Sequence, residues 1–382
     1  MQQFERRMFI RGAISLMAVP ALARVIPDWL TLAAQSQQAM PFRMLVLGDS
    51  VVWGQGLNED AKFYTIVQKG LEQQLGRRVD KLNLSHSGAT ILPKAKPCPA
   101  LPGEVPIVTP TIYTQANAAL SLYAAAGIKP EEVDLVLLNG GINDIGFPVI
   151  VNPFTSDKKL TDQSKKYCFK EMSELLRALH QSFPNAHLVV AGYFPIISKA
   201  TDPNVLPKLI QAFLGLSNGD KVLRAAAKQQ REQSKRAAKV NDEKLMRSNW
   251  LVDRLAQLSD VWKTRSDADL QAAVDAVNAN ARTATFVKVV FADDECYAAN
   301  KTNLWKITGS SGGVGNLITD DQMFSQRGET CRLIQADLKG TARLICPVAG
   351  TGHPNSFGSK KYAAAILEKL STILSKVDKS RS

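Results

Sequence analysis

Five short apolar runs alternate along the chain with segments of helical periodicity, and this alternation restricts the fold more than any other feature. The apolar runs are Arg43–Leu47, Lys81–Leu84, Val133–Leu138, His187–Ala191 and Thr285–Phe291. Such runs are typical of strands that are buried on both faces by helices. The helical segments are Ala61–Leu75, Gln115–Ala126, Ser164–Ser182 and Ser359–Leu374. This order predicts an α/β fold, a three-layer α/β/α doubly wound parallel sheet.

The chain is longer than one compact core requires, because its 382 residues exceed the roughly 250–300 at which a single core stops growing. Residues 201–283 interrupt the alternation, so we interpret them as a helical insertion in one domain over residues 40–376. The insertion is either a hairpin that packs on the domain, since apolar stripes are usually core, or a lid over a site. Its apolar residues at helical spacing are Val205, Leu206, Leu209, Ile210, Phe213 and Leu214, then Leu251, Leu255, Leu258 and Trp262.

Residues 1–39 are predicted to be a twin-arginine export signal with a flexible N-terminus. The segment Arg6–Arg11 fits the twin-arginine pattern, the apolar stretch Gly12–Val19 follows, and Ala21–Ala23 offers a cleavage site. A second cleavage site lies near Gln38-Ala39. The alternative is a basic amphipathic helix on an intracellular protein. Because motif, apolar stretch and cleavage site come in the right order, we expect a periplasmic or secreted protein.

The chain carries a formal net charge of +12 and has a pI of about 9.4. Nucleic-acid binding is one interpretation of such an excess, but the sequence has no motif for it and many acidic residues dilute the basic ones. A solvated basic surface is the simpler interpretation, and such a surface also suits peripheral contact with an anionic membrane. We therefore expect no nucleic-acid partner.

The five cysteines are spaced for disulfides rather than for a metal site. Export would bring them into an oxidising compartment. Cys331 and Cys346 are near in sequence and Cys296 precedes them, so one or two disulfides are expected and an odd cysteine stays free. The pairing stays open, because spacing does not determine it. No CxxC pair or His/Cys cluster predicts a metal.

Three chemically distinctive side chains follow predicted strands or lie on a late loop. Ser50 ends a Gly-Asp-Ser tripeptide directly after the first strand, and Asn143 follows the third strand in Gly-Gly-Ile-Asn-Asp. His353 lies in His-Pro-Asn near the C-terminus. In doubly wound sheets, sites form at the carboxyl ends of strands. A serine, an amide and a histidine at such positions are the parts of an acyl-transfer site.

The segment GDSVVWGQGL at residues 48–57 resembles the first sequence block of the SGNH/GDSL family of serine esterases and lipases. Gly88, in NLSHSGAT, is similar to the family's second block, and the surroundings of Asn143 and His353 resemble its later blocks. The resemblance runs from about Met44 to Leu370 apart from the insertion. It implies a flavodoxin-like three-layer fold and an esterase that needs no metal and no cofactor.

The resemblance also implies a role for each of four residues. Ser50 would be the nucleophile, and His353 the general base that takes its proton. The backbone N–H of Gly88 and the side-chain amide of Asn143 would stabilise the oxyanion. His86, two residues before Gly88, is a further candidate for a direct role. The proline-rich loop Pro93–Pro110 should border the site.

One expected residue is absent, because the family places an aspartate three residues before the histidine and this chain has Gly350 there. Three explanations stay open at the level of sequence. A backbone carbonyl near Gly350 orients His353 in a serine–histidine dyad; Asp293 or Asp294 reaches in from another loop; or the site is impaired. The last would make the chain a glycan- or lipid-binding module.

The sequence thus predicts an exported serine esterase that acts on carboxylic esters through an acyl-Ser50 intermediate. The apolar part of the insertion favours lipid or acyl esters over other small molecules or glycan esters. A carbohydrate O-acetyl esterase or an O-acyltransferase is the alternative on the same fold. The oligomeric state is not predicted.

Overall fold

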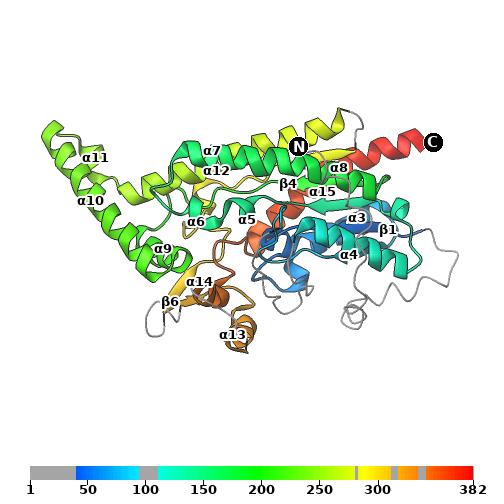
Figure 1. The fold of residues 1–382 in the computed structure, drawn as a ribbon, viewed down its shortest axis with the longest axis horizontal. Helices are drawn as coiled ribbons and strands as arrows, with labels where there is room; N and C mark the ends of the chain where they lie inside the picture. Colours follow the sequence, from blue (N-terminus) through cyan, green and yellow to red (C-terminus); the bar gives the residue numbers. More distant parts are fainter. Residues whose placement is uncertain (1–39, 94–110, 280–282, 311–316, 334–340, 382) are drawn as a thin grey trace, which may run out of the picture. The chain divides into compact units, whose positions relative to one another are not determined.

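The structure is a computed structural model that describes residues 40–93, 111–279, 283–310, 317–333 and 341–381 (Figure 1). Five parallel strands form one sheet in the order β2-β1-β3-β4-β5. The predicted doubly wound parallel sheet is therefore confirmed. The strands are β1 Phe42–Val46, β2 Val79–Asn83, β3 Leu135–Leu138, β4 His187–Ala191 and β5 Ala284–Val287.

The strands form where the apolar runs predicted them, with shifts at their ends. β1 and β3 are buried along their whole length, as expected of strands covered on both faces. β5 is shorter than predicted and stops at Val287, and Val290 further along is 62% exposed. The apolar run of Thr285–Phe291 therefore continues past the point where the chain leaves the sheet.

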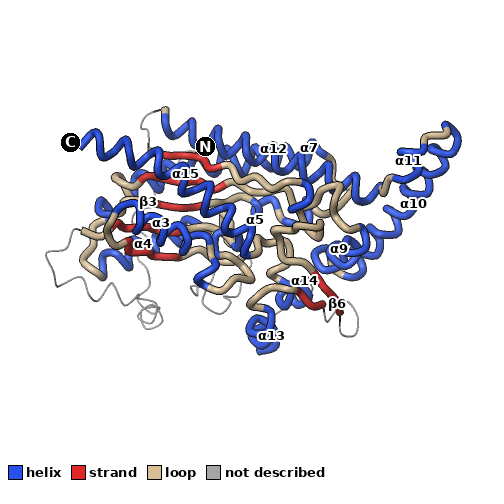
Figure 2. The backbone as a smooth tube through the Cα atoms, turned by 180° about the vertical axis from the view of Figure 1, so that it is seen from behind, coloured by secondary structure: helices blue, strands red, loops and turns tan. Residues whose placement is uncertain are grey.

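Helices cover both faces of the sheet, so the sheet is the middle layer of three (Figures 1 and 2). α3 (Phe63–Leu75) joins β1 to β2 and packs on the C-terminal helix α15 (Ser356–Arg381). α4 (Ile112–Ala125) and α8 (Met172–Ser182) connect strands in the opposite direction along the sheet, so right-handed crossovers place them on the other face. The segment predicted as one helix over Ser164–Ser182 begins with a π-helical stretch, η5 Lys165–Glu171.

The predicted insertion over residues 201–283 divides into two parts. Its last helix, α12 (Trp250–Asn278), is the crossover from β4 to β5 and packs on β5 and α8. Leu255, Leu258 and Trp262 are fully buried there, so their spacing reflects the core of the fold. The helices that interrupt the α/β pattern are shorter: η6 Pro203–Val205, α9 Leu206–Leu214, α10 Leu216–Val240 and α11 Glu243–Arg247.

A mixed region follows β5 and leads to the C-terminal helix. A disulfide joins Cys331 in α13 to Cys346 in η9, with Cα atoms 5.8 Å apart. Cys168 and Cys296 are buried free thiols, and Cys98 lies outside the described residues. The elements are η7 Asp293–Glu295, the antiparallel pair β6 Ile307–Ser310 and β7 Leu317–Thr319, α13 Phe324–Leu333, α14 Thr341–Ile345 and η9 Cys346–Val348.

Two predictions fall on segments outside the described residues, namely the export signal at 1–39 and nearly all of the loop Pro93–Pro110. Of the helices that are described, none combines the length and the apolar character needed to cross a bilayer.

Candidate active site

Ser50 begins a short helix, α2 (Ser50–Trp53), at the carboxyl end of β1. The turn before it depends on Gly48, which has φ of +133° and whose missing Cβ would lie 2.4 Å from Asn139 Oδ1. Asp49 caps α2, because its carboxylate accepts a hydrogen bond of 2.8 Å from the Val51 N–H. The turn therefore fixes the backbone of Ser50 at the sheet edge where sites of this fold form.

The Asp49 carboxylate also joins this turn to the ends of the two neighbouring strands. It accepts 2.7 Å from the Tyr193 hydroxyl, just after β4, and 2.9 Å from Asn139 Nδ2, just after β3. The pKa of Asp49 is raised by its complete burial, against which these hydrogen bonds act. Sequence reasoning missed both partners, although each is a polar residue directly past an apolar run.

His353 reaches Ser50 from the other end of the chain. Its Nε2 lies 2.7 Å from Ser50 Oγ. The loop that carries it pairs with an earlier segment: the Gly352 N–H donates to Trp305 O at 2.8 Å, and the Trp305 N–H donates to His353 O at 2.9 Å. Asn355 then caps α15 through hydrogen bonds to the N–H groups of Phe357 and Gly358. The structure thus brings together the predicted nucleophile and base.

The group that orients His353 is a backbone carbonyl. His353 Nδ1 lies 3.2 Å from Gly350 O, and a carbonyl only accepts hydrogen bonds, so Nδ1 carries the proton. Nε2 then presents its lone pair to the Ser50 hydroxyl. Burial of most of the ring lowers the pKa of His353 to about 4, against the pull of the Gly350 carbonyl in the other direction. The imidazole is therefore a neutral base over a wide pH range.

Neither acid that the sequence offered as an alternative takes this position. The Asp294 carboxylate pairs with Lys301 Nζ at 2.8 Å, and this contact lowers its pKa. Asp293 lies in the same turn, η7, and lines a groove between α12, β5 and α15. Within the described residues neither of them contacts His353. Of the three explanations that the sequence left open, the contacts thus agree with the backbone carbonyl of Gly350 and not with Asp293 or Asp294.

A different acid lies behind Gly350. A Cβ on Gly350 would lie 2.6 Å from Asp321 Oδ2. The Asp321 carboxylate is completely buried, pairs with Arg327 and accepts a hydrogen bond from Thr319 Oγ1. The space of a triad aspartate is therefore already occupied by a carboxylate from another loop. No motif in the sequence pointed to Asp321 or Arg327.

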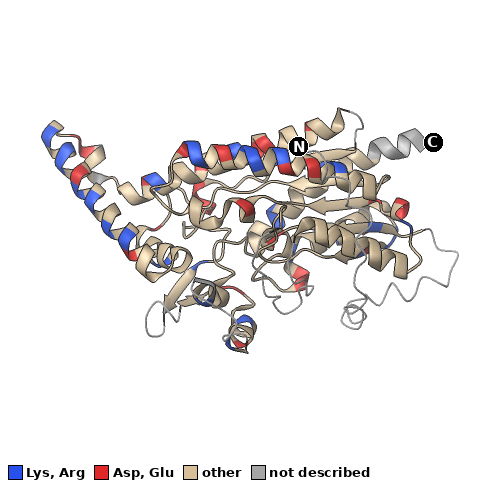
Figure 3. Cartoon of the chain, in the orientation of Figure 1, with Lys and Arg blue, Asp and Glu red and all other residues tan. Residues whose placement is uncertain are grey.

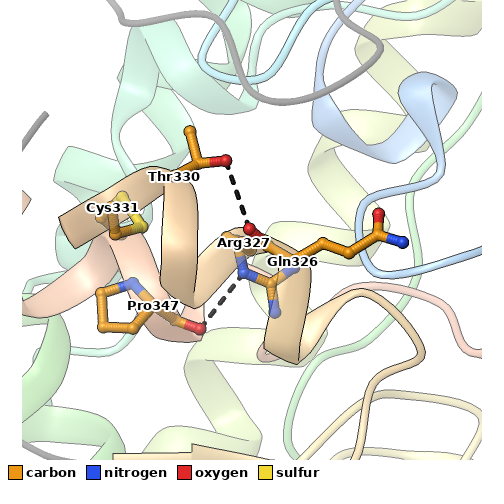
Figure 4. Close-up of a disulfide and its surroundings, with 6 residues drawn as sticks. Gln326, Arg327, Thr330, Cys331 and Pro347 are labelled. Carbon is orange, nitrogen blue, oxygen red and sulfur yellow. Dashed lines mark hydrogen bonds between the residues drawn. A yellow bond between two sulfur atoms is a disulfide. The ribbon is translucent and has the colours of Figure 1, made fainter. Parts of the chain in front are cut away.

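Arg327 and the disulfide both join α13 to η9, the turn that precedes the histidine loop (Figure 4). The Arg327 guanidinium donates through Nε to Pro347 O at 3.2 Å. The disulfide between Cys331 and Cys346 joins the same two elements, α13 and η9. Together they fix the chain just before Gly350, whose carbonyl position decides the orientation of His353.

The two residues predicted to stabilise the oxyanion lie on the loops after β2 and β3 and are joined through Ala89. Gly88 has φ of +77°, and Asn143 Nδ2 donates to the carbonyl of the next residue, Ala89, at 2.9 Å. Asp144 holds the same loop by accepting from the Ile91 and Leu92 N–H groups. Within the described residues the N–H groups of Ser50 and Gly88 have no protein acceptor.

Two of the remaining histidines make contacts within the fold. His86 is completely buried, with Nδ1 2.7 Å from Ser87 O, and the base at Ser50 is His353. His187 Nε2 lies 2.8 Å from Thr285 Oγ1, and burial lowers its pKa to about 4. The described residues also contain no group of three or more metal-binding side chains that could hold an ion.

A family profile described as the GDSL-like Lipase/Acylhydrolase family matches residues 46–293, which is well over half of the chain. The chain belongs to this family. As a member of the GDSL-like lipase/acylhydrolase family it is a hydrolase of ester bonds, which confirms the resemblance seen in the sequence. The matched region begins at the end of β1 and includes the turn of Ser50 and the loops of Gly88 and Asn143.

Solved structures of low identity are similar to the chain. Phospholipase A1 from Streptomyces albidoflavus NA297 shares 11% identity over 87% of this chain and 99% of its own, with a TM-score of 0.41. An extracellular lipase from Streptomyces rimosus shares 13% over the same fractions, with a TM-score of 0.42. A family two carbohydrate esterase from Clostridium thermocellum in complex with cellohexaose shares 10% over 88% and 66%, with a TM-score of 0.35. No curated protein sequence matches the chain.

Restoring the absent acid should harm the site. The substitution Gly350→Asp would force a second carboxylate against Asp321, so the loop of His353 must shift, and a shift of about 1 Å typically costs about 10²-fold in rate. The matched control is Gly309→Asp, because the Cβ position of Gly309 is open. The rate of covalent labelling by a fluorophosphonate measures the effect. A faster rate in Gly350→Asp would contradict the geometry.

The labelling rate should fall at acidic pH, and the pH at which it falls, the acid limb of the pH profile, should depend on Asp321 and Arg327. The neutral imidazole is the active form, so labelling should fall as the pH drops through the His353 pKa of about 4. Arg327 lowers that pKa and Asp321 raises it, so Arg327→Gln should move the limb to higher pH and Asp321→Asn to lower pH.

The matched control for this pH experiment is Arg332→Gln, which changes an exposed residue of the same helix and should leave the limb in place. Each single variant leaves a buried charge without its partner, which typically lowers the stability of a protein by about 3–5 kcal/mol. The double variant Asp321→Asn/Arg327→Gln removes both charges and is therefore measured beside the single ones. Shifts of both single variants in the same direction would rule out the electrostatic explanation.

Proposed function

We propose that the chain is an exported serine esterase that hydrolyses carboxylic esters through an acyl-Ser50 intermediate. The observation that carries this proposal is the contact of 2.7 Å between Ser50 Oγ and His353 Nε2, with Nδ1 held by Gly350 O. A serine hydroxyl becomes a nucleophile only when a neighbouring base takes its proton. Here nucleophile, base and orienting group form one connected chain.

The reaction follows from this geometry in two halves. His353 Nε2 takes the Ser50 proton as Oγ attacks the ester carbonyl, and the negative charge on the carbonyl oxygen faces the N–H groups of Ser50 and Gly88 and the Asn143 amide. The intermediate collapses, and the leaving alcohol takes the proton from His353. Water then attacks the acyl-Ser50 carbonyl with the same base, which releases the acid and restores the hydroxyl.

The Gly350 carbonyl performs the orienting part of a triad acid's role. It fixes the correct tautomer of His353, and its dipole faces the Nδ1–H when the ring becomes positively charged. It has no full negative charge, so it stabilises the imidazolium less than a carboxylate would. The low His353 pKa, about 4, agrees with a base that is oriented but not charge-paired.

Apolar side chains beside the histidine support lipid or acyl esters as substrates. The Phe147 ring, in α6 (Phe147–Ile150), lies 3.6 Å from the Cβ position of Gly352. Phe213 of α9 contacts that ring with a centroid distance of 4.4 Å. Because Gly352 directly precedes His353, this aromatic pair lies beside the histidine loop, and apolar side chains bind a hydrocarbon chain through burial of apolar area.

Fluorophosphonate labelling of the purified protein, located by peptide mass, tests the proposal. We expect one labelled peptide, which contains Ser50, and a loss of at least about 10³-fold in labelling rate for Ser50→Ala and His353→Ala. The matched control is Ser371→Ala, which removes an exposed hydroxyl of α15 and should change nothing. Unlabelled, folded protein would favour the glycan- or lipid-binding module instead.

A panel of esters then separates the substrate classes. Rates that rise from acetyl to octanoyl esters, with the rise lost in Phe147→Ala, would support acyl-chain binding. Activity restricted to acetylated sugars would instead indicate a carbohydrate O-acetyl esterase, and transfer to added alcohol in place of water would indicate an acyltransferase.

Export by a twin-arginine signal is the second part of the proposal. It is supported by the motif at Arg6–Arg11 and by the disulfide between Cys331 and Cys346, a bond that persists in oxidising compartments. We expect Arg6→Lys/Arg7→Lys to retain the protein in the cytoplasm of an expressing bacterium, with Lys158→Arg as the control. Cell fractionation and the N-terminal mass of the exported protein measure this. Equal export of both variants would exclude the twin-arginine route.

A further inference from the structure

Helix α10 carries a continuous basic stripe. Seven basic and two acidic residues give this single helix a net charge of +5, and Figure 3 shows lysine and arginine positions repeating along it. Six of the seven basic residues are three or four positions apart, so they fall within one sector of the helix over about 27 Å of its length. They are exposed: Lys221, Arg224, Lys228, Arg231, Lys235 and Lys239.

The opposite face of α10 packs on the protein, which fixes the direction of the stripe. Gly219 lies so close to α9 that a Cβ there would be 2.8 Å from Gln211 Cα. Ala226 and Ala237 are buried on the same side, and Gln230 accepts 2.6 Å from the Trp250 N–H at the start of α12. The stripe therefore faces solvent because the other side of the helix is held.

The described part of the chain does not neutralise this charge. Within the described residues, none of the seven basic side chains of α10 forms an ion pair. The segments outside the described residues contribute only four acids in total, Glu5, Asp28, Glu104 and Asp337. A repeated positive charge that is fixed in direction and without internal partners indicates an external polyanion.

We propose that the basic stripe of α10 docks the protein on an anionic phospholipid surface. Lysine and arginine side chains near such a surface are attracted to its negative potential. Two apolar side chains are exposed at the ends of α10, Leu216 at 43% and Val240 at 70%, but on other sides of the helix than the stripe. A continuous basic helix face has the charge that the headgroups of anionic lipids attract, so we take a bilayer as the partner and make a nucleic acid an outcome of the test.

Docking at α10 would bring the ester site toward lipid. α9 packs on α10 and also on α6 and α14, and its Phe213 contacts Phe147 beside Gly352. The short helix α9 and the Phe147 ring therefore lie between the stripe and the loop of His353. The inference goes beyond the proposed esterase activity and does not depend on Ser50 chemistry.

Co-sedimentation with vesicles tests the proposal on the full mature chain in the Ser50→Ala form, which cannot consume lipid. We expect binding to phosphatidylcholine vesicles that contain about 30% phosphatidylglycerol, and little binding to pure phosphatidylcholine. The quadruple variant Lys228→Gln, Arg231→Gln, Lys235→Gln, Lys239→Gln should lose at least about tenfold in partition, because each lost charge weakens attraction to the surface. High salt should weaken binding in the same way.

The matched control removes the same net charge elsewhere, with Lys159→Gln, Lys165→Gln, Lys166→Gln and Lys170→Gln, all exposed, and should bind as the parent does. In the active form, both quadruple variants should hydrolyse a soluble ester at the parent rate, which separates docking from catalysis and from misfolding. Equal binding to both vesicle types, or an equal loss in both variants, would overturn the proposal. So would stripe-dependent binding to duplex DNA without binding to anionic vesicles, which would make a nucleic acid the partner.

Discussion

The buried carboxylate of Asp49 is the contact on which the site depends. It caps the helix of Ser50 and accepts from Asn139 and Tyr193, so three strand ends share one anion. A buried carboxylate is unfavourable unless its oxygens are satisfied, and its raised pKa reflects that burial. The carboxylate therefore stays in place only while β1, β3 and β4 are in register, which links the position of Ser50 to the sheet.

The histidine is oriented by a contact of a different kind. The Gly350 carbonyl belongs to the main chain, so its position depends on everything that fixes the loop before it. That support comes from Arg327, from the disulfide and from the pairing of Gly352 with Trp305. A triad aspartate can be removed by one substitution. The Gly350 carbonyl cannot, because it belongs to the main chain and several residues between β7 and α15 fix its position. The site thus exchanges a charged partner for a rigid one.

Much of the fold could be predicted from the sequence, because buried parallel strands leave a clear apolar pattern, as in β1, β3 and β4. The serine and histidine were predictable for a similar reason, since local motifs mark the turn at Ser50 and the cap at Asn355. Partners far apart in sequence were not predictable: Asp321 leaves no local signal, and only the folded chain brings it against Gly350. Helical spacing alone could not separate α12, which packs on β5 and α8, from the helices that interrupt the α/β pattern, because the spacing is the same in both.

A side chain at position 350 would overlap with the Asp321 carboxylate, so the residues at these two positions depend on each other. With Asp321 in place, only glycine fits at position 350, so an acid before the histidine would require the loss of Asp321 first. That loss would leave the Arg327 guanidinium buried without its partner. A change from this dyad to a triad would therefore require substitutions at position 350, at position 321 and at the partner of position 321 together. In this chain the glycine three residues before the histidine and the distant aspartate–arginine pair therefore act as one structural unit.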